Sequence, residues 1–130
     1  MYIKRWLKTP FITKDGQLIE RKSGTPQGGV ISPVLANMFL HYVFDMWMKR
    51  NFPQAPFERY VDDGIIHCQT KEEAVFIKEN LAKRFAECKL ELHSVKTRIV
   101  YCKDKDRTRK EELSEFDFLG YTFKAVYIKC

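Results

Sequence analysis

Apolar and polar side chains alternate in several short stretches of this chain, as they do along strands with one buried face. The stretch PFITKDGQLIE alternates on both sides of Asp15-Gly16, a dipeptide that favours tight turns, and therefore predicts a first hairpin. A second hairpin is predicted from two β-rich runs, residues 57–61 and 65–68, which flank Asp62-Asp63-Gly64. We expect further short strands at residues 90–92 and 97–101, and a last strand pair within residues 116–128.

Two other segments carry apolar residues at intervals of three and four, the period of an amphipathic helix. The first helix is predicted to have Ser32 as its N-cap and Pro33 at its first position, and to run to about Lys49. The second is predicted from Lys71 to about Cys88. The apolar positions are Leu35, Met38, Phe39, Tyr42, Val43, Met46 and Trp47 in the first helix, and Ala74, Ile77, Leu81, Phe85 and Cys88 in the second.

The order hairpin, helix, hairpin, helix, strand, hairpin predicts an α+β fold with helices on one face of an antiparallel sheet. A helix of this kind usually crosses between paired strands, so the order fits a split βαβ, ferredoxin-like unit that lacks its first strand. No internal repeat or linker is visible, and residues 1–130 are interpreted as a single domain.

Composition narrows the class of protein. An apolar content of 45% favours a globular chain, and a net charge of +6 favours a polyanionic partner. The four cysteines have no paired spacing typical of a zinc site, which indicates reduced thiols of an intracellular protein. No apolar run is long enough to span a bilayer, so we expect no membrane partner and a cytoplasmic location.

The two neighbouring acids at the tip of the second predicted hairpin need an explanation, because like charges repel. Asp-Gly is a favoured hairpin corner, so turn chemistry alone could account for Asp62-Asp63-Gly64. Alternatively, two carboxylates at one tip attract a hard divalent cation such as Mg²⁺, with Asp62 facing the shared site. A two-metal site needs a third acid; Asp15 and Asp45 are interpreted as solvated surface acids, so the third should lie on the missing strand.

At this point the motifs resemble a known family. Tyr60-Val61-Asp62-Asp63 resembles the Tyr-x-Asp-Asp box of reverse transcriptases, with Val61 where group II enzymes more often have Ala. The block from Gly24 to Asn37, GTPQGGVISPVLAN, is similar to the one that precedes this box in group II intron-encoded and bacterial reverse transcriptases. The resemblance continues through Leu90, Leu92, Lys96 and Thr97, and through the primer-grip-like Phe118-Leu119-Gly120-Tyr121.

The resemblance implies a polymerase palm that lacks its first strand, together with roles for individual residues. Asp62 and Asp63 would bind two Mg²⁺ ions, and Lys96 would assist the leaving pyrophosphate. Fingers, thumb, maturase and endonuclease parts are not recognisable in the chain. The remaining implied roles are nucleotide binding for Gln27, Gly28 and Tyr60, and primer or template contact for Asn37, Gly120 and Tyr121.

Two functions therefore follow as expectations. The first is a fragment of an RNA-directed DNA polymerase, inactive alone, whose partners are an RNA template, a DNA primer, deoxynucleotides and intron RNA. The second is a non-catalytic, maturase-type RNA-binding module that assists splicing, for which the basic charge is the supporting feature. An exposed sheet edge, left by the missing strand, also predicts a homodimer.

Overall fold

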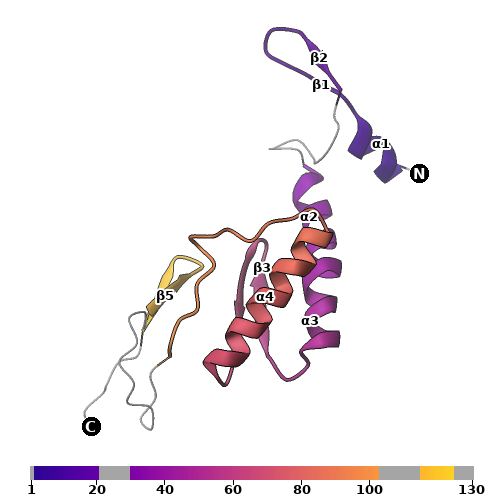
Figure 1. Ribbon diagram of the computed structural model, residues 1–130. Coiled ribbons are helices and arrows are strands. Elements are labelled where there is room, and N and C mark those ends of the chain that lie inside the picture. Colours follow the sequence, from indigo (N-terminus) through magenta and orange to yellow (C-terminus); the bar gives the residue numbers. More distant parts are fainter. Residues whose placement is uncertain (1, 21–29, 103–114, 125–130) are drawn as a thin grey trace. The chain divides into compact units, whose positions relative to one another are not determined.

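The computed structural model describes residues 2–20, 30–102 and 115–124 (Figure 1). The chain divides into two compact units, Met1–Met38 and Phe39–Cys130, and each is described by itself. The single-domain interpretation stays a prediction.

The first unit contains the predicted first hairpin. Strands β1 (Phe11–Ile12) and β2 (Leu18–Ile19) pair in antiparallel fashion, and Gly16 has a φ of +76° in the turn. Thr13 closes the loop, since its N–H donates to the Gln17 carbonyl at 2.9 Å and its carbonyl accepts from Gly16 at 2.9 Å. The hairpin is confirmed, although its loop is longer than a two-residue turn.

A short helix that we did not predict, α1 (Tyr2–Lys8), precedes this hairpin. Its segment YIKRWLK places apolar residues one helical turn apart, and this spacing could have predicted the helix. The Thr9 hydroxyl donates to the Arg5 carbonyl at 2.7 Å at the end of the helix. Lys8 lies in the last turn, where a cation interacts favourably with the helix dipole.

The predicted helix from Ser32 is confirmed and extends slightly further than expected, in three consecutive segments. Helix α2 (Ser32–Leu40) is followed by a π-helical turn, η1 (His41–Asp45), and by α3 (Met46–Asn51). The π turn is marked by the Met46 N–H, which bonds to the His41 carbonyl five residues back.

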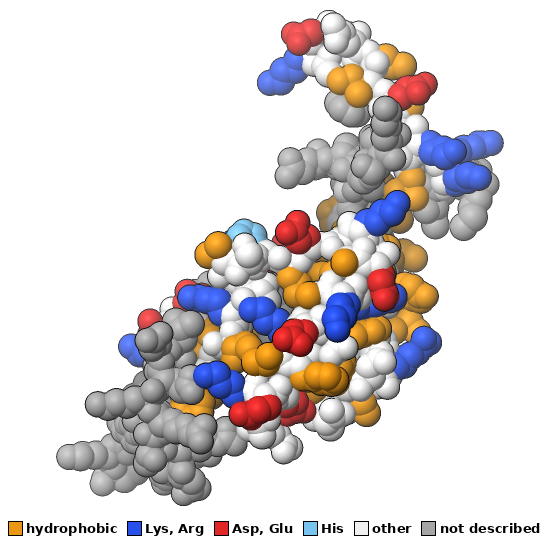
Figure 2. Space-filling model, viewed as in Figure 1, with side chains coloured by type: hydrophobic (Ala, Val, Ile, Leu, Met, Phe, Trp, Pro, Cys, Tyr) orange, Lys and Arg blue, Asp and Glu red, His pale blue; other side chains and the backbone are white. Residues whose placement is uncertain are grey.

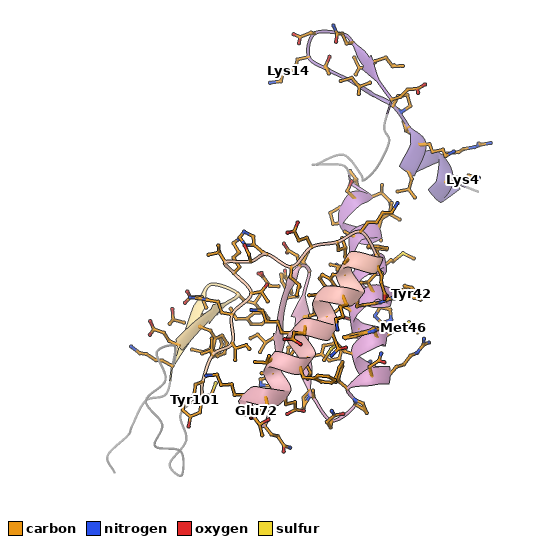
Figure 3. The ribbon with its side chains drawn as sticks, in the orientation of Figure 1. Lys4, Lys14, Tyr42, Met46, Glu72 and Tyr101 are labelled. Carbon is orange, nitrogen blue, oxygen red and sulfur yellow. The ribbon has the colours of Figure 1, made fainter. Side chains whose placement is uncertain are left out.

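This π turn changes which side chains are buried. We predicted that Tyr42, Val43, Met46 and Trp47 share the apolar face, but Val43, Phe44 and Met48 are the buried residues and Tyr42 is exposed. Figure 3 shows Tyr42 and Met46 on successive turns of this helix. A π turn holds one extra residue, so the periodicity of a regular helix gives the wrong face beyond it.

Helix α4 (Lys71–Glu87) is confirmed, with Ile77 and Leu81 of its predicted apolar face buried. It begins with a capping arrangement: the Thr70 side chain accepts from the Glu73 N–H at 3.1 Å, and the Glu73 carboxylate accepts from the Gln69 N–H at 2.9 Å. The first bond satisfies an N–H group that the first helical turn leaves without a partner, and the second fixes the residue that precedes the cap.

The core of the second unit lies between these helices and the second hairpin. The hairpin consists of β3 (Phe57–Tyr60) and β4 (Asp63–Ile66), and its Phe57 and Ile66 pack against the buried cluster. Phe44 joins η1, α4 and the hairpin. The centroid of its ring lies 5.2 Å from that of Phe57 and 6.4 Å from that of Phe85, and both contacts are edge to face. The buried cluster comprises Phe44, Met48, Phe52, Ala55, Ile77 and Leu81.

The strands predicted at residues 90–92 and 97–101 do not form. Within the described ranges no segment pairs with them, and a strand needs a neighbour for its backbone hydrogen bonds. Residues 93–97 instead form a turn, in which the Thr97 N–H donates to the His93 carbonyl at 2.9 Å. Lys78 on α4 holds this turn, since its ammonium donates to the Thr97 carbonyl at 3.1 Å.

The last predicted strand pair is present as β5 (Glu115–Phe118) and β6 (Tyr121–Lys124). Phe116 and Phe123 stack across it with their ring centroids 5.1 Å apart. The described strands thus form three two-stranded antiparallel sheets. The predicted α+β class is confirmed, and the arrangement is compatible with the polymerase palm that the resemblance implies. None of the described helices combines the length and apolar character needed to cross a membrane.

Candidate active site

The acidic pair lies at the end of the β3–β4 hairpin, as predicted. Tyr60 pairs with Asp63, so Val61 and Asp62 form a two-residue turn between the strands. Asp62 therefore lies in the turn itself, and Asp63 is the first residue of β4. Both acids are exposed, and the structure records no hydrogen bond or ion pair from either carboxylate to another described residue. The hairpin presents two neighbouring negative charges to solvent.

The backbone of this turn is unusual at Val61. Its φ of +55° lies in the left-handed region, where a β-branched residue is a rare outlier. Gly64 has no positive φ and pairs with Arg59 inside the hairpin. The expected Asp-Gly corner is therefore wrong, because the register places the turn two residues earlier, at Val61-Asp62. Such strain persists only where surrounding contacts hold the backbone.

One of those contacts comes from Arg59. Its Nη1 donates to the Val61 carbonyl at 2.7 Å, while its Nε and Nη2 donate to the two carboxylate oxygens of Asp45 at 2.7 and 2.8 Å. Arg–carboxylate pairs of this bidentate kind are strong and geometrically specific. The turn that carries Asp62 is thereby connected to η1.

Asp45 was interpreted as a solvated surface acid, and this was wrong. Its side chain is 15% exposed and that of Arg59 is 12% exposed. The hydrogen bonds from Arg59 hold the pKa of the Asp45 carboxyl below its ordinary value, against burial, which raises it; His41, at 2.9 Å, also lowers it. The same pair raises the pKa of Arg59.

Sequence reasoning missed Arg59, although a signal was present. In a strand, alternate residues share a face, so Arg59 lies on the same side as Phe57, which packs against the core. A guanidinium on an inward face needs an acidic partner. Asp45, on the helix packed against this hairpin, provides that partner.

The acidic pair does not by itself form a metal site. Carboxylate oxygens suit hard cations such as Mg²⁺, so Asp62 and Asp63 fit as ligands in kind. In the described part of the chain, however, no three acidic, histidine or cysteine side chains gather closely enough to hold a metal ion. A surface pocket of about 480 Å³ adjoins the Asp45–Arg59 pair but is lined by neither Asp62 nor Asp63. A metal ion bound at Asp62 and Asp63 would need further ligands from outside the described residues.

The other predicted site residues are spread over several elements. Tyr60 precedes the acidic turn directly and is 61% exposed. Lys96 is exposed on the 93–97 turn, where its N–H donates to the His93 imidazole Nδ1 at 3.3 Å. Asn37 is exposed on α2, which belongs to the first unit up to Met38.

The predicted primer-grip residues lie at the turn of the last hairpin. Gly120 has a φ of +79°, which explains the need for glycine there, and Tyr121 is 72% exposed. Gln27 and Gly28 lie outside the described residues. The structure thus brings Tyr60, Asp62 and Asp63 together.

An α+β unit with adjacent carboxylates on a hairpin turn is the arrangement expected of a polymerase palm. Comparison with known families supports this class: residues 1–123 match the family described as "Reverse transcriptase (RNA-dependent DNA polymerase)". The chain therefore belongs to the reverse transcriptase family.

Among curated proteins, the chain is similar to the group II intron-encoded protein LtrA of Lactococcus lactis subsp. cremoris and to the protein of the same name from its strain MG1363. Each is 39% identical over 59 residues, which are 44% of this chain and 10% of the relative. The chain thus matches about a tenth of the length of these relatives. No solved structure matches it significantly.

Proposed function

We propose that this chain is the palm part of an RNA-directed DNA polymerase of a group II intron, and that the β3–β4 turn carries its metal-binding carboxylates. The observation that carries the proposal is the pair of exposed, adjacent acids at a turn whose backbone is held in place. Family membership supports the same function. The substrates in this proposal are an RNA template, a DNA primer and deoxynucleotides, and intron RNA is a further partner.

Asp62 and Asp63 would contribute oxygen ligands for two Mg²⁺ ions, together with a third carboxylate from outside the described residues. Ions held there would lower the pKa of the primer hydroxyl and would stabilise the negative charge on the leaving pyrophosphate. Lys96 would supply a positive charge, or a proton, to that leaving group. Its exposed position on a turn fixed by Lys78 supports this role.

The remaining residues would bind the nucleotide and the nucleic acid strands. Tyr60, exposed beside the acidic pair, would contact the incoming nucleotide together with Gln27 and Gly28. Asn37, Gly120 and Tyr121 would contact primer or template, for which the exposed Tyr121 ring at a tight turn offers a stacking surface.

We expect the chain to be inactive alone. A two-metal site needs a third carboxylate, and none of the described residues adds one to this pair; the chain also matches only about a tenth of the length of its relatives. Activity would require palm, fingers and thumb parts outside these residues. The proposed location is the cytoplasm, where RNA and deoxynucleotides are available.

Metal binding tests the proposal most directly. Mn²⁺ should broaden the backbone amide NMR signals of residues 60–64 in the full chain, and Mg²⁺ should compete. Asp62→Asn should remove the effect, because it replaces an anionic ligand by a neutral amide. Asp15→Asn is the matched control, since Asp15 lies at another hairpin turn without a neighbouring acid. Broadening that is absent, or equal in wild type and Asp62→Asn, would reject the site.

The second candidate function, a non-catalytic RNA-binding module, is supported by α1. Lys4, Arg5 and Lys8 line one surface pocket, the helix contains no acid, and Figure 2 shows basic side chains gathered there. This function predicts salt-dependent RNA binding that Asp62→Asn leaves unchanged and that replacing Lys4, Arg5 and Lys8 by glutamine weakens. RNA binding that is weakened by Asp62→Asn would instead favour the polymerase function.

The homodimer also belongs to this proposal. Among the described strands, β3 and β4 each have only one hydrogen-bonded neighbour, so each has an open edge. Open edges pair readily with other strands. Light scattering should show mass increasing with concentration, and a monomer at the highest concentrations would contradict the dimer.

A further inference from the structure

We infer that Arg59 is a positioning residue that sets the direction of the Asp62 carboxylate by holding the Val61 carbonyl. Its consequence for metal binding rests on the function proposed above. Arg59 bonds to the main-chain carbonyl of Val61, the residue before Asp62, so its role would be exerted through the backbone.

The geometry of the guanidinium carries the inference. Two of its nitrogens donate to Asp45 and the third, Nη1, donates to the Val61 carbonyl at 2.7 Å. Because the guanidinium is planar and rigid, fixing two nitrogens on a carboxylate also fixes where the third one points. Lysine carries the same charge but cannot make this arrangement, since its ammonium is a single point charge.

The anchor of this arrangement is firmly placed. Asp45 follows Phe44, a core residue whose ring packs against Phe57 and Phe85, at the end of the π turn. The imidazole Nδ1 of His41 lies 2.9 Å from the Asp45 carboxylate as a second partner. The position of the Arg59 guanidinium is therefore fixed by the core and not by the exposed turn.

The Val61 carbonyl is an effective point at which to hold this turn. A peptide group is planar, so the direction of the Val61 carbonyl also fixes the plane that contains the nitrogen and Cα of Asp62. Val61 has a φ of +55°, which a β-branched residue leaves readily for a more favourable conformation. Without the hydrogen bond, the turn is expected to sample other conformations, and the Asp62 side chain would change direction with them.

Arg59→Lys in the full chain tests the inference. In the metal-free protein, the amide signals of residues 61–63 should shift and exchange faster with solvent, while signals from α4 stay in place. The dissociation constant for Mn²⁺ at the turn should rise about tenfold, the factor that corresponds to one charge-assisted hydrogen bond. A purely structural ion pair would lower the melting temperature and leave the turn signals and the Mn²⁺ affinity unchanged, which would overturn the inference.

Arg84→Lys is the matched control. Arg84 also contacts a main-chain carbonyl of η1, since its Nε donates to the Val43 oxygen at 3.4 Å, but it does not contact the turn. This variant should leave the amide signals of residues 61–63 and the Mn²⁺ affinity as in wild type. Equal changes in both variants would mean that any arginine on this core has the same effect, and would overturn the inference.

Asp45→Asn is a second variant that tests the inference if Arg59→Lys fails to fold. It keeps the Arg59 donor but weakens its anchor, so the signals of residues 61–63 should shift in the same direction by a smaller amount. Unchanged signals would again overturn the inference. If wild type itself binds no Mn²⁺ at the turn, the proposed function fails, whereas the metal-free signals still decide whether Arg59 holds the turn.

Discussion

Replacing Gly64 by alanine should stabilise the second unit, although Gly64 directly follows the two acids in a sequence that looks like a hairpin corner. In the structure Gly64 lies within β4 and has no positive φ. A Cβ added there would lie 3.7 Å from the Glu58 carbonyl oxygen and 3.8 Å from Cζ of Phe44, both ordinary van der Waals distances. Alanine therefore fits without strain.

The expected gain follows from two contributions. Alanine restricts the unfolded chain, which is worth about 0.4–1 kcal/mol where the native backbone accepts it. The methyl contact with the Phe44 ring adds a fraction of the ~0.8 kcal/mol typical of a buried methylene. We expect a net stabilisation of about 0.5–1 kcal/mol, which for a unit of this size raises the melting temperature by roughly 3–6 °C.

Thermal unfolding followed by circular dichroism measures this change, and Gly120→Ala is the matched control. Gly120 lies at a hairpin turn with a φ of +79°, and a Cβ there meets no atom within 4 Å, so only backbone strain acts. The control should lose about 1–2 kcal/mol. A loss of 1 kcal/mol or more in Gly64→Ala would mean that Gly64 occupies the left-handed region. The turn would then lie at Asp63-Gly64, and the argument about Val61 and Arg59 would fail.

Three further predictions concern the same unit. Hydrogen bonds from Arg59 lower the pKa of Asp45, so the contribution of the ionised Asp45 to stability is complete above about pH 4 and is lost as the pH falls through the lowered pKa. Urea unfolding at pH 5 and pH 3 should therefore show a smaller acid-induced loss of unfolding free energy in Asp45→Asn than in wild type. Thr70→Ala removes the bond that caps α4 at Glu73 and should cost about 1 kcal/mol in the same assay, so a change below ~0.3 kcal/mol would contradict the capping role. Phe44→Ala should cost about 3–5 kcal/mol and abolish cooperative unfolding, and a variant that still melts cooperatively near the wild-type temperature would show that Phe44 does not join the hairpin to the helices.

Local patterns along the chain were enough to identify the family and the position of its acidic pair. The spacing of Ile77 and Leu81 predicted α4 and its buried face, and the alternation around residues 57–68 predicted the hairpin that carries the acids. These features depend on residues close in sequence, whose periodicity follows directly from helix and strand geometry. The motifs around Tyr60 predicted membership of the reverse transcriptase family, which the comparison confirms.

Tertiary contacts decided what the local patterns could not. The strands expected at residues 90–92 and 97–101 lack a pairing neighbour among the described residues, and the π turn at His41–Asp45 changes which face of its helix is buried. The turn register at Val61-Asp62 and the contact of Arg59 with Asp45, 14 residues away in sequence, depend on how the hairpin packs against η1. Hydrogen bonds and packing between distant segments set these features, because their energies depend on which groups meet in space, and a linear sequence read in short windows does not contain that information.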